Sequence, residues 1–283
     1  MASFTNFATL SYNGGTTNSN IVTGEILEAL TAVKTAVSAN YSAGDRITYA
    51  LSFVNTGTAA ITDYTVTDNL GGYTVGANTV YPLAYNAGTV RYYINGVLQT
   101  APTVTAGPPL TVTGLTVPAG GNAVLIYETT ATPVAPLATG SSITNTATIT
   151  GGGLTNPITA QATVETANSA ELSISKALSP TTVTENGQIT YTFVISNTGN
   201  TEATATGNVV VTDTFAPILR NIAVTYNGTA WTEGTNYTYN AATGVFTTLA
   251  GQITVPAATF TQNTDGTFTV TPGTATLVIT GTI

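Results

Sequence analysis

Six side chains of this sequence are of the types that can join two strands covalently. They form two sets of one lysine, one aspartate and one asparagine: Lys34, Asp68 and Asn145, then Lys176, Asp213 and Asn6. A desolvated neutral lysine amine can attack an asparagine carboxamide, while a protonated aspartic acid shuttles the proton and polarises the carbonyl. The product is an isopeptide bond. The same residues could instead form a buried lysine and aspartate ion pair with asparagine as a hydrogen-bond partner.

Strand alternation places all six side chains on inward faces. Lys176 shares a face with Leu172, Ile174 and Leu178, and Asp213 shares one with Val211. Burying an unpaired charge costs several kcal/mol. Lys34 and Lys176 are the only lysines of the chain, and both are predicted to point inward, which indicates that each is paired with a carboxylate. We expect Lys34 to meet Asp68 and Lys176 to meet Asp213.

The elements that carry these residues are predicted to be short strands. Runs rich in Val, Ile, Thr, Tyr and Phe alternate in polarity and are separated by Asn-Gly, Gly-Gly and Pro, which is typical of antiparallel sandwiches. Residues 26–37 also fit helical spacing. Their repeat counterpart at residues 171–177, ELSISKA, alternates with period two, which favours a strand.

An internal repeat predicts two tandem modules. ITYALSFVNTG at residues 47–57 matches ITYTFVISNTG at residues 189–199, and a Val-Thr-Asp motif recurs at residues 66–68 and 211–213. We therefore predict an all-β fold with an N-terminal donor strand or hairpin at residues 1–28, a complete Ig-like module at residues 29–166 and a second module at residues 167–283 that lacks its closing strand.

The leading segment resembles the closing strand of the first module. FTNFATLSYNGG at residues 4–15 matches ITNTATITGG at residues 143–152, and no third copy follows Ile283. The sequence therefore predicts that the leading strand enters the second module of a neighbouring subunit. Its inward face would comprise Phe4, Asn6, Ala8, Leu10 and Tyr12. Residues 13–20 could be a flexible joint or the turn of a hairpin whose second arm is residues 21–27.

The order of these motifs resembles the DUF11 family of Ig-like repeats. The resemblance covers roughly residues 29 to 283 through the A-x-L-S-I-S-K, I-T-Y, N-T-G, V-T-D and terminal T-N-T-A-T-I-T patterns. Such repeats occur in bacterial and archaeal surface proteins, including subunits similar to those of clostridial spore appendages. The resemblance implies an extracellular β-sandwich on a cell or spore surface, with a structural role and no catalytic activity on a substrate.

Composition excludes several classes of function. The chain has 283 residues with no His and no Cys, which excludes thiol chemistry and the usual zinc ligands. A net charge of -8 is unfavourable for binding nucleic acid. Asp45, Asp63 and Asp265 stand singly in predicted turns, so no metal and no cofactor is assigned. No segment has the length and apolarity of a membrane span.

Three functions remain, in order of preference. The first is a surface filament or pilus subunit that polymerises with itself, head to tail, through donor-strand complementation. In this hypothesis Lys34 bonds to Asn145 with assistance from Asp68, and Lys176 bonds to Asn6 of the next subunit with assistance from Asp213. The second is a monomeric adhesive or ligand-binding module pair whose leading strand folds back. The third, an enzyme, is disfavoured by the absence of His and Cys.

Overall fold

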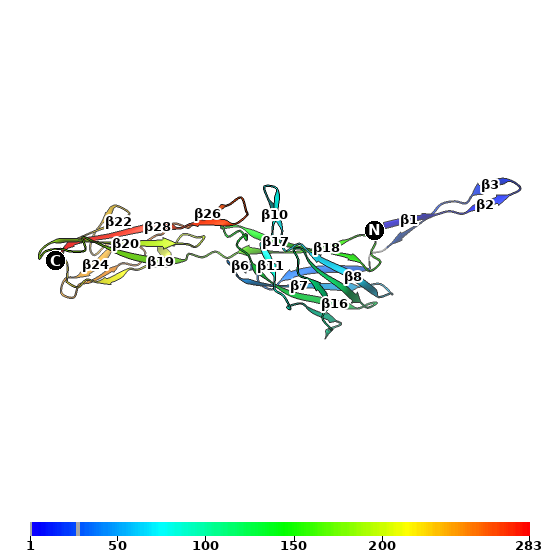
Figure 1. The fold of residues 1–283 in the computed structure, drawn as a ribbon, viewed down its shortest axis with the longest axis horizontal. Helices are drawn as coiled ribbons and strands as arrows, with labels where there is room; N and C mark the ends of the chain where they lie inside the picture. Colours follow the sequence, from blue (N-terminus) through cyan, green and yellow to red (C-terminus); the bar gives the residue numbers. More distant parts are fainter. Residues whose placement is uncertain (1, 27–28) are drawn as a thin grey trace. The chain divides into compact units, whose positions relative to one another are not determined.

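The computed structural model describes residues 2–26 and 29–283 and divides them into two compact units (Figure 1). Unit 1 comprises Met1–Ala135 and Ser142–Glu165, and unit 2 comprises Pro136–Ser141 and Thr166–Ile283. Among the described residues the single helical element is the short 3-10 helix η1 (Ala205–Gly207). The predicted all-β class with antiparallel sandwich modules is confirmed.

Unit 1 is a sandwich of two six-stranded antiparallel sheets (Figure 1). The first sheet has the order β13 (Val97–Leu98), β12 (Arg91–Ile94), β16 (Asn122–Ala131), β7 (Arg46–Asn55) and β5 (Leu30–Ala36), with β11 (Leu83–Tyr85) also on β16. The second has the order β14 (Thr103–Thr105), β15 (Leu110–Val117), β8 (Ile61–Asp68), β17 (Ser142–Gly151), β18 (Ile158–Thr166) and β6 (Asn40–Tyr41). A separate hairpin joins β9 (Tyr73–Val75) to β10 (Asn78–Val80).

The core of unit 1 follows the alternation of its strands. Along β7 every second side chain, including Tyr49, Leu51 and Phe53, is buried. The Phe53 ring packs on Tyr64 of β8, with 5.3 Å between centroids, so the two sheets meet face to face. Residues 26–37 therefore contain a strand, β5, as the repeat predicted.

The repeated Asn-Thr-Gly motif has a structural role in both units. The buried Asn55 side chain donates to the carbonyls of Ala59 and Pro118 and accepts from the Gly57 amide. Asn197 makes the corresponding bonds in unit 2. A buried side-chain amide that hydrogen-bonds several backbone groups fixes the end of its strand. This structural role explains why the motif recurs, and no catalytic role is needed.

Unit 2 repeats the first sheet but has fewer strands in the second. Its five-stranded sheet has the order β19 (Leu172–Ser179), β20 (Gln188–Asn197), β28 (Gly273–Thr282), β22 (Arg220–Tyr226) and β23 (Thr229–Trp231). Its second sheet has only β21 (Thr212–Thr214), β25 (Val245–Thr248) and β24 (Tyr237–Asn240). A further hairpin pairs β26 (Thr259–Gln262) with β27 (Phe268–Thr271). Phe215, Phe246 and Tyr237 anchor the core.

The leading segment is a hairpin, which decides between the two predicted forms. Strand β1 (Ala2–Asn6) pairs with β4 (Val22–Ile26), and β2 (Thr9–Tyr12) pairs with β3 (Gly15–Asn18). The two-residue turn Asn13-Gly14 has positive φ at both residues, 49° and 81°, as a type I′ turn requires. All described side chains from Phe4 to Thr23 are exposed.

The segment Pro136–Ser141 groups with unit 2, although the predicted boundary placed it in the first module. Asn200 holds this segment in unit 2. The Asn200 side chain donates to the Leu137 carbonyl, and the Asn200 backbone carbonyl accepts from the Thr139 hydroxyl. The leading hairpin groups with unit 1.

Candidate functional site

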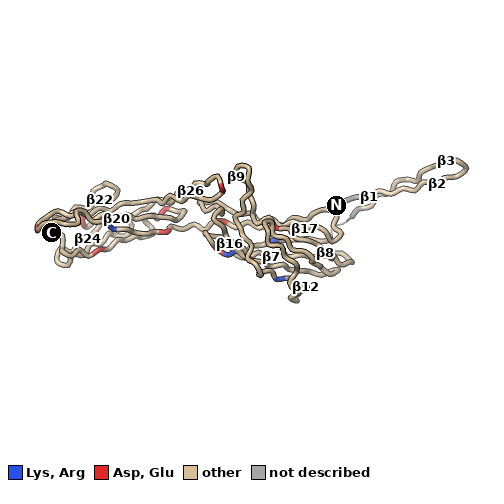
Figure 2. Tube along the Cα trace, viewed as in Figure 1, with Lys and Arg blue, Asp and Glu red and all other residues tan. Residues whose placement is uncertain are grey.

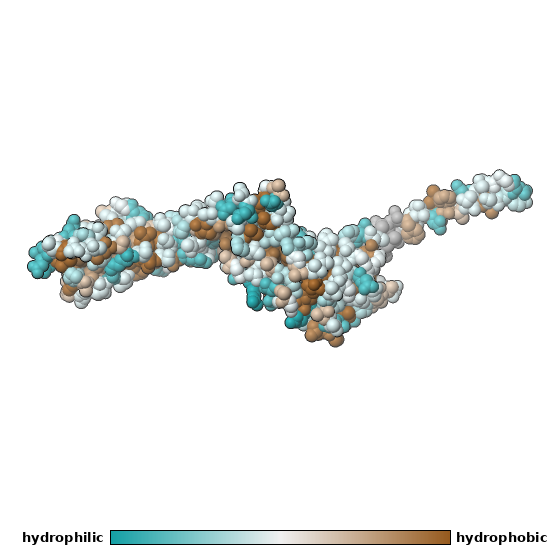
Figure 3. Space-filling view, viewed as in Figure 1, coloured by the Kyte–Doolittle hydropathy of each residue, from teal (hydrophilic) through white to brown (hydrophobic). Residues whose placement is uncertain are grey.

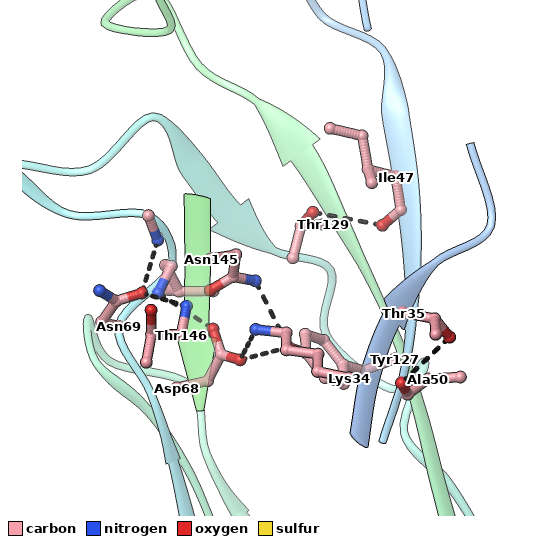
Figure 4. Close-up of polar contacts among 12 residues, drawn as sticks. Lys34, Thr35, Ile47, Ala50, Asp68, Asn69, Tyr127, Thr129, Asn145 and Thr146 are labelled. Atoms are coloured by element: carbon pink, nitrogen blue, oxygen red, sulfur yellow. Dashed lines mark hydrogen bonds and ion pairs between the residues drawn. The ribbon is translucent and has the colours of Figure 1, made fainter. Parts of the chain in front are cut away.

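Unit 1 brings Lys34, Asp68 and Asn145 together in its interior (Figure 4). Lys34 comes from β5 in one sheet, and the other two come from the neighbouring strands β8 and β17 of the facing sheet. The Lys34 Nζ lies 2.5 Å from Asp68 Oδ2, and both side chains are inaccessible to solvent. In a chain whose charges are few and scattered (Figure 2), this ion pair crosses the core between the two sheets.

Two tyrosines complete this cluster, and neither was among the sequence-predicted residues. Tyr127 of β16 donates its hydroxyl to Asp68 Oδ2, and Asn145 Nδ2 lies 3.5 Å from the same hydroxyl. Tyr49 stacks on Tyr127, with 5.8 Å between centroids, and its ring lies 4.8 Å from the Lys34 Nζ. The signal was present in the sequence, because both tyrosines occupy inward positions of alternating strands.

Burial changes the ionisation of two side chains in the cluster. Burial lowers the pKa of Lys34 from 10.5 to about 8, although the charge of Asp68 and its hydrogen bond act in the opposite direction. Burial, followed by the charge of Asp68, raises the pKa of Tyr127 well above its ordinary value. Within the described structure, the buried Asn145 Oδ1 and Tyr49 hydroxyl have no hydrogen-bond partner. An unpaired buried polar atom costs about 1 to 3 kcal/mol, so this network is not fully satisfied as it stands.

Unit 2 brings together only two members of the second set. Lys176 of β19 donates to Asp213 Oδ2 of β21. Its amine also makes cation–π contacts with the rings of Tyr191, Phe193 and Phe215. The Lys176 side chain is 40% exposed, whereas that of Lys34 is fully buried. The third member, Asn6, stands exposed in the leading hairpin. The position opposite Tyr191 on β28 is Ile279, where unit 1 has Tyr127 opposite Tyr49.

The lysine of unit 2 is exposed because the apolar face of β19 that carries it is uncovered. In unit 1 the inward face of β5 is covered, and Leu30 is 2% exposed. Its counterpart on β19, Leu172, is 40% exposed, and Ile174 and Leu178 on the same face are exposed as well. Among the described residues β21 pairs only with β25, whereas its counterpart β8 lies between β15 and β17. Unit 2 therefore has an unpaired strand edge beside an uncovered apolar face.

The part of the leading hairpin formed by β1 and β4 has the pairing register of the strand pair that lies beside β8 in unit 1. In the hairpin Ser3 pairs with Glu25, Thr5 with Thr23 and Asn6 with Val22. Strands β17 and β18 pair Ser142 with Glu165, Thr144 with Thr163 and Asn145 with Ala162. The first two pairs are identical in residue type. The inner part of the hairpin, β1 with β4, thus repeats the pairing of β17 with β18 and the place of its asparagine. The outer part, β2 with β3, is shifted by one residue, because Leu10 pairs with Thr17.

The faces of the hairpin also correspond to those of β17. In the sequence alignment Phe4, Asn6, Ala8 and Leu10 correspond to Ile143, Asn145, Ala147 and Ile149, all of which are buried in unit 1. In the hairpin these four side chains are exposed, and the Phe4 ring lies across Gly24 of the other arm. Figure 3 shows hydrophobic patches on the surface of the hairpin. Tyr12, the last predicted donor residue, is exposed beside the turn. No described residue therefore covers the apolar side chains of the hairpin.

The described residues include no cluster of three acidic side chains that could hold a metal ion. No described helix has the length and apolarity needed to cross a membrane.

Comparison with known proteins gives structural similarities at low sequence identity. No protein-family model and no curated protein sequence matches the chain. The chain is similar to BcpA, the major pilin subunit of Bacillus cereus, at 15% identity and a TM-score of 0.36, covering 96% of this chain and 73% of that one. It is similar to the pilus backbone RrgB of Streptococcus pneumoniae at 14% identity and a TM-score of 0.36, covering 86% of this chain and 55% of that one.

A third similarity is to the N-terminal domain of the Streptococcus gordonii adhesin Sgo0707, at 15% identity and a TM-score of 0.36. It covers 47% of this chain and 31% of that one, so the chain spans less than a third of that adhesin domain. Because each of these TM-scores is below 0.5, the function proposed below depends on the residues of this chain alone.

Proposed function

We propose that this chain is the subunit of an extracellular filament on a cell or spore surface, assembled by insertion of the leading hairpin of one copy into unit 2 of the next. The observation that carries the proposal is the shared register of β1 with β4 and of β17 with β18. Such a strand pair would add to the free edge of β21 and would cover the exposed apolar side chains of β19.

Insertion would satisfy both partners of the joint. The backbone groups on the free edge of β21 would gain a partner strand. The exposed Leu172, Ile174 and Leu178 would be covered by the apolar hairpin face that includes Phe4 and Leu10. Complete burial of each such side chain contributes about 1.5 to 3 kcal/mol. Because the hairpin and the face of β19 are different surfaces, the contact is heterologous and generates an open fibre.

The register of unit 1 specifies how the hairpin would dock. In unit 1 Ala147 lies opposite Asp68 and Ile149 opposite Val66. By correspondence, Ala8 would lie opposite Asp213 and Leu10 opposite Val211. Asn6 would then approach the Lys176 and Asp213 pair in the way that Asn145 lies beside Lys34 and Asp68.

We further propose that each site closes by an isopeptide bond. Within unit 1 the bond would join Lys34 to Asn145 with Asp68 as the acid. Between subunits it would join Lys176 to Asn6 with Asp213 as the acid. The support is the burial of Lys34, its low pKa, and the contact of its amine with a carboxylate beside an asparagine. A polymer joined in this way would resist detergent and heat without disulfides, which this chain cannot form.

Deletion of residues 2–26 tests the filament proposal. The shortened protein should stay monomeric at concentrations at which the full chain forms fibres visible by negative-stain microscopy. The shortened protein keeps the acceptor surface of unit 2, formed by β19 and the free edge of β21, but has no hairpin to donate. A small molar fraction of it should therefore bind one end of a growing fibre of the full chain, stop growth there and shorten the fibres. Normal fibres from the shortened protein would refute the proposal. A full chain that stays monomeric at all concentrations would favour the adhesive module instead.

A further inference from the structure

The Tyr127 hydroxyl connects the acid of the unit 1 cluster to the group that must leave. It donates to Asp68 Oδ2, the same oxygen that lies 2.5 Å from the Lys34 Nζ, and it lies 3.5 Å from Asn145 Nδ2 (Figure 4). A continuous path therefore runs from the attacking amine through the carboxylate and the phenol to the amide nitrogen. The last contact is long, as catalytic contacts often are before the reacting groups approach each other.

We propose that Tyr127 is a catalytic residue that relays a proton from Asp68 to the departing amide nitrogen of Asn145. This inference rests on the proposed isopeptide closure of unit 1. The amide nitrogen is a poor leaving group until it is protonated, and Asp68 already contacts the lysine. A hydroxyl that both accepts and donates can pass the proton on without a net change of its own.

The reaction balances with the residues present. The protonated Lys34 gives one proton to Asp68, and the free amine attacks the Asn145 Cγ. As the bond between Cγ and Nδ2 breaks, a second lysine proton follows the path through Asp68 and Tyr127 to Nδ2, which leaves as ammonia. The products are the amide between Lys34 Nζ and Asn145 Cγ, free ammonia, a protonated Asp68 and an unchanged Tyr127.

Unit 2 lacks this relay, which makes the two sites unequal. Ile279 takes the position of Tyr127, and the described contacts of the Asp213 carboxylate are with the Lys176 amine and the Thr214 amide. If Asn6 docks beside this pair, the acid must reach the leaving nitrogen directly. The bond within unit 1 should therefore form faster than the bond between subunits. Each subunit would then contain its internal bond before it is joined covalently to the next subunit.

The test follows ammonia loss by intact mass after cell-free synthesis of the full chain, with samples quenched in acid at intervals. The monomer mass reports the bond within unit 1, and a dimer mass that persists in denaturant reports the bond between subunits. We expect Tyr127→Phe to slow ammonia loss from the monomer by about 100-fold or more, which is typical of a lost acid or base. Tyr64→Phe is the matched control, because Tyr64 is also buried in unit 1 and its hydroxyl lies 3.5 Å from that of Tyr92, not beside the cluster. It should change the rate less than about threefold, since it lies outside the relay.

The reciprocal variant Ile279→Tyr should speed the bond between subunits, and it decides the matter if Tyr127→Phe does not fold. A purely structural Tyr127 would leave the rate in folded Tyr127→Phe close to that of the unmodified chain, which would overturn the relay while leaving isopeptide closure intact. Equal slowing by Tyr64→Phe would also overturn it. An unmodified chain that never loses ammonia would refute closure and the relay together.

Discussion

Leu10→Asp should abolish fibre growth while leaving the subunit folded. Leu10 is 65% exposed in the free hairpin, and the residue that takes its place in unit 1, Ile149, is fully buried. The hairpin hydrogen bonds of Leu10 are with Thr17 in the other arm and do not depend on its side chain. The substitution therefore acts on the joint between subunits.

The size of the effect follows from burial and charge. Burying a leucine completely contributes about 1.5 to 3 kcal/mol. The exposed two thirds of Leu10 would thus contribute about 1 to 2 kcal/mol, or roughly a 5- to 30-fold change in affinity. Aspartate adds the cost of an unpaired carboxylate buried opposite Val211 and near Asp213, which brings the loss to at least about 4 kcal/mol. The critical concentration should rise by roughly 1000-fold.

The control is Ser11→Asp, which adds the same charge at the next position on the opposite face. Its counterpart in unit 1, Thr150, is exposed, so the critical concentration should change by less than about threefold. Fibre mass can be measured by sedimentation over a concentration series, with negative-stain microscopy of the pellets. Equal critical concentrations for the unmodified chain and Leu10→Asp would refute the docking face. A Ser11→Asp protein as defective as Leu10→Asp would show that charge alone blocks assembly.

Three further predictions concern the acceptor surface and the two sites. On the acceptor side, Ile174→Asp should block assembly as Leu10→Asp does, whereas Ser175→Asp on the other face of β19 should assemble normally by the same sedimentation assay. Asn6→Ala should still form fibres, but sodium dodecyl sulfate with heating should dissolve them to monomers, and ladders that persist would exclude Asn6 as the bonding residue. The variant Asn145→Ala cannot form the bond within unit 1. When the pH is raised from about 8 to about 9.5, its free energy of unfolding in urea should increase by about 1 to 2 kcal/mol more than that of the double variant Asn145→Ala with Lys34→Met. Burial lowers the pKa of the folded Lys34 amine to about 8, so this amine releases its proton between these pH values while the unfolded amine keeps its own, and stability rises with pH. The unmodified chain, in which the bond has formed, should lack this rise. The same pH dependence of stability in all three proteins would contradict the assignment of this pKa to Lys34.

Strand alternation predicted the inward faces well in unit 1. Lys34, Asp68 and Asn145 are all buried there, as the period of two requires. The same pattern placed Lys176 on an inward face, and it does meet Asp213, yet its side chain remains 40% exposed. Alternation decides which side of a sheet a residue occupies, but it does not decide whether another layer covers that side.

Local patterns and repeats along the chain were enough to predict the β class, the repeated modules, the inward residues and the likeness of the leading segment to β17. Strand neighbours came from the fold alone. The fold added Tyr127 to the cluster, placed Ile279 in the corresponding position of unit 2, and paired β1 with β4 in the register of β17 with β18. The physical reason is that a side chain's partners across a sandwich depend on strand order and pairing register, which bring together residues far apart in the chain and which no single strand encodes.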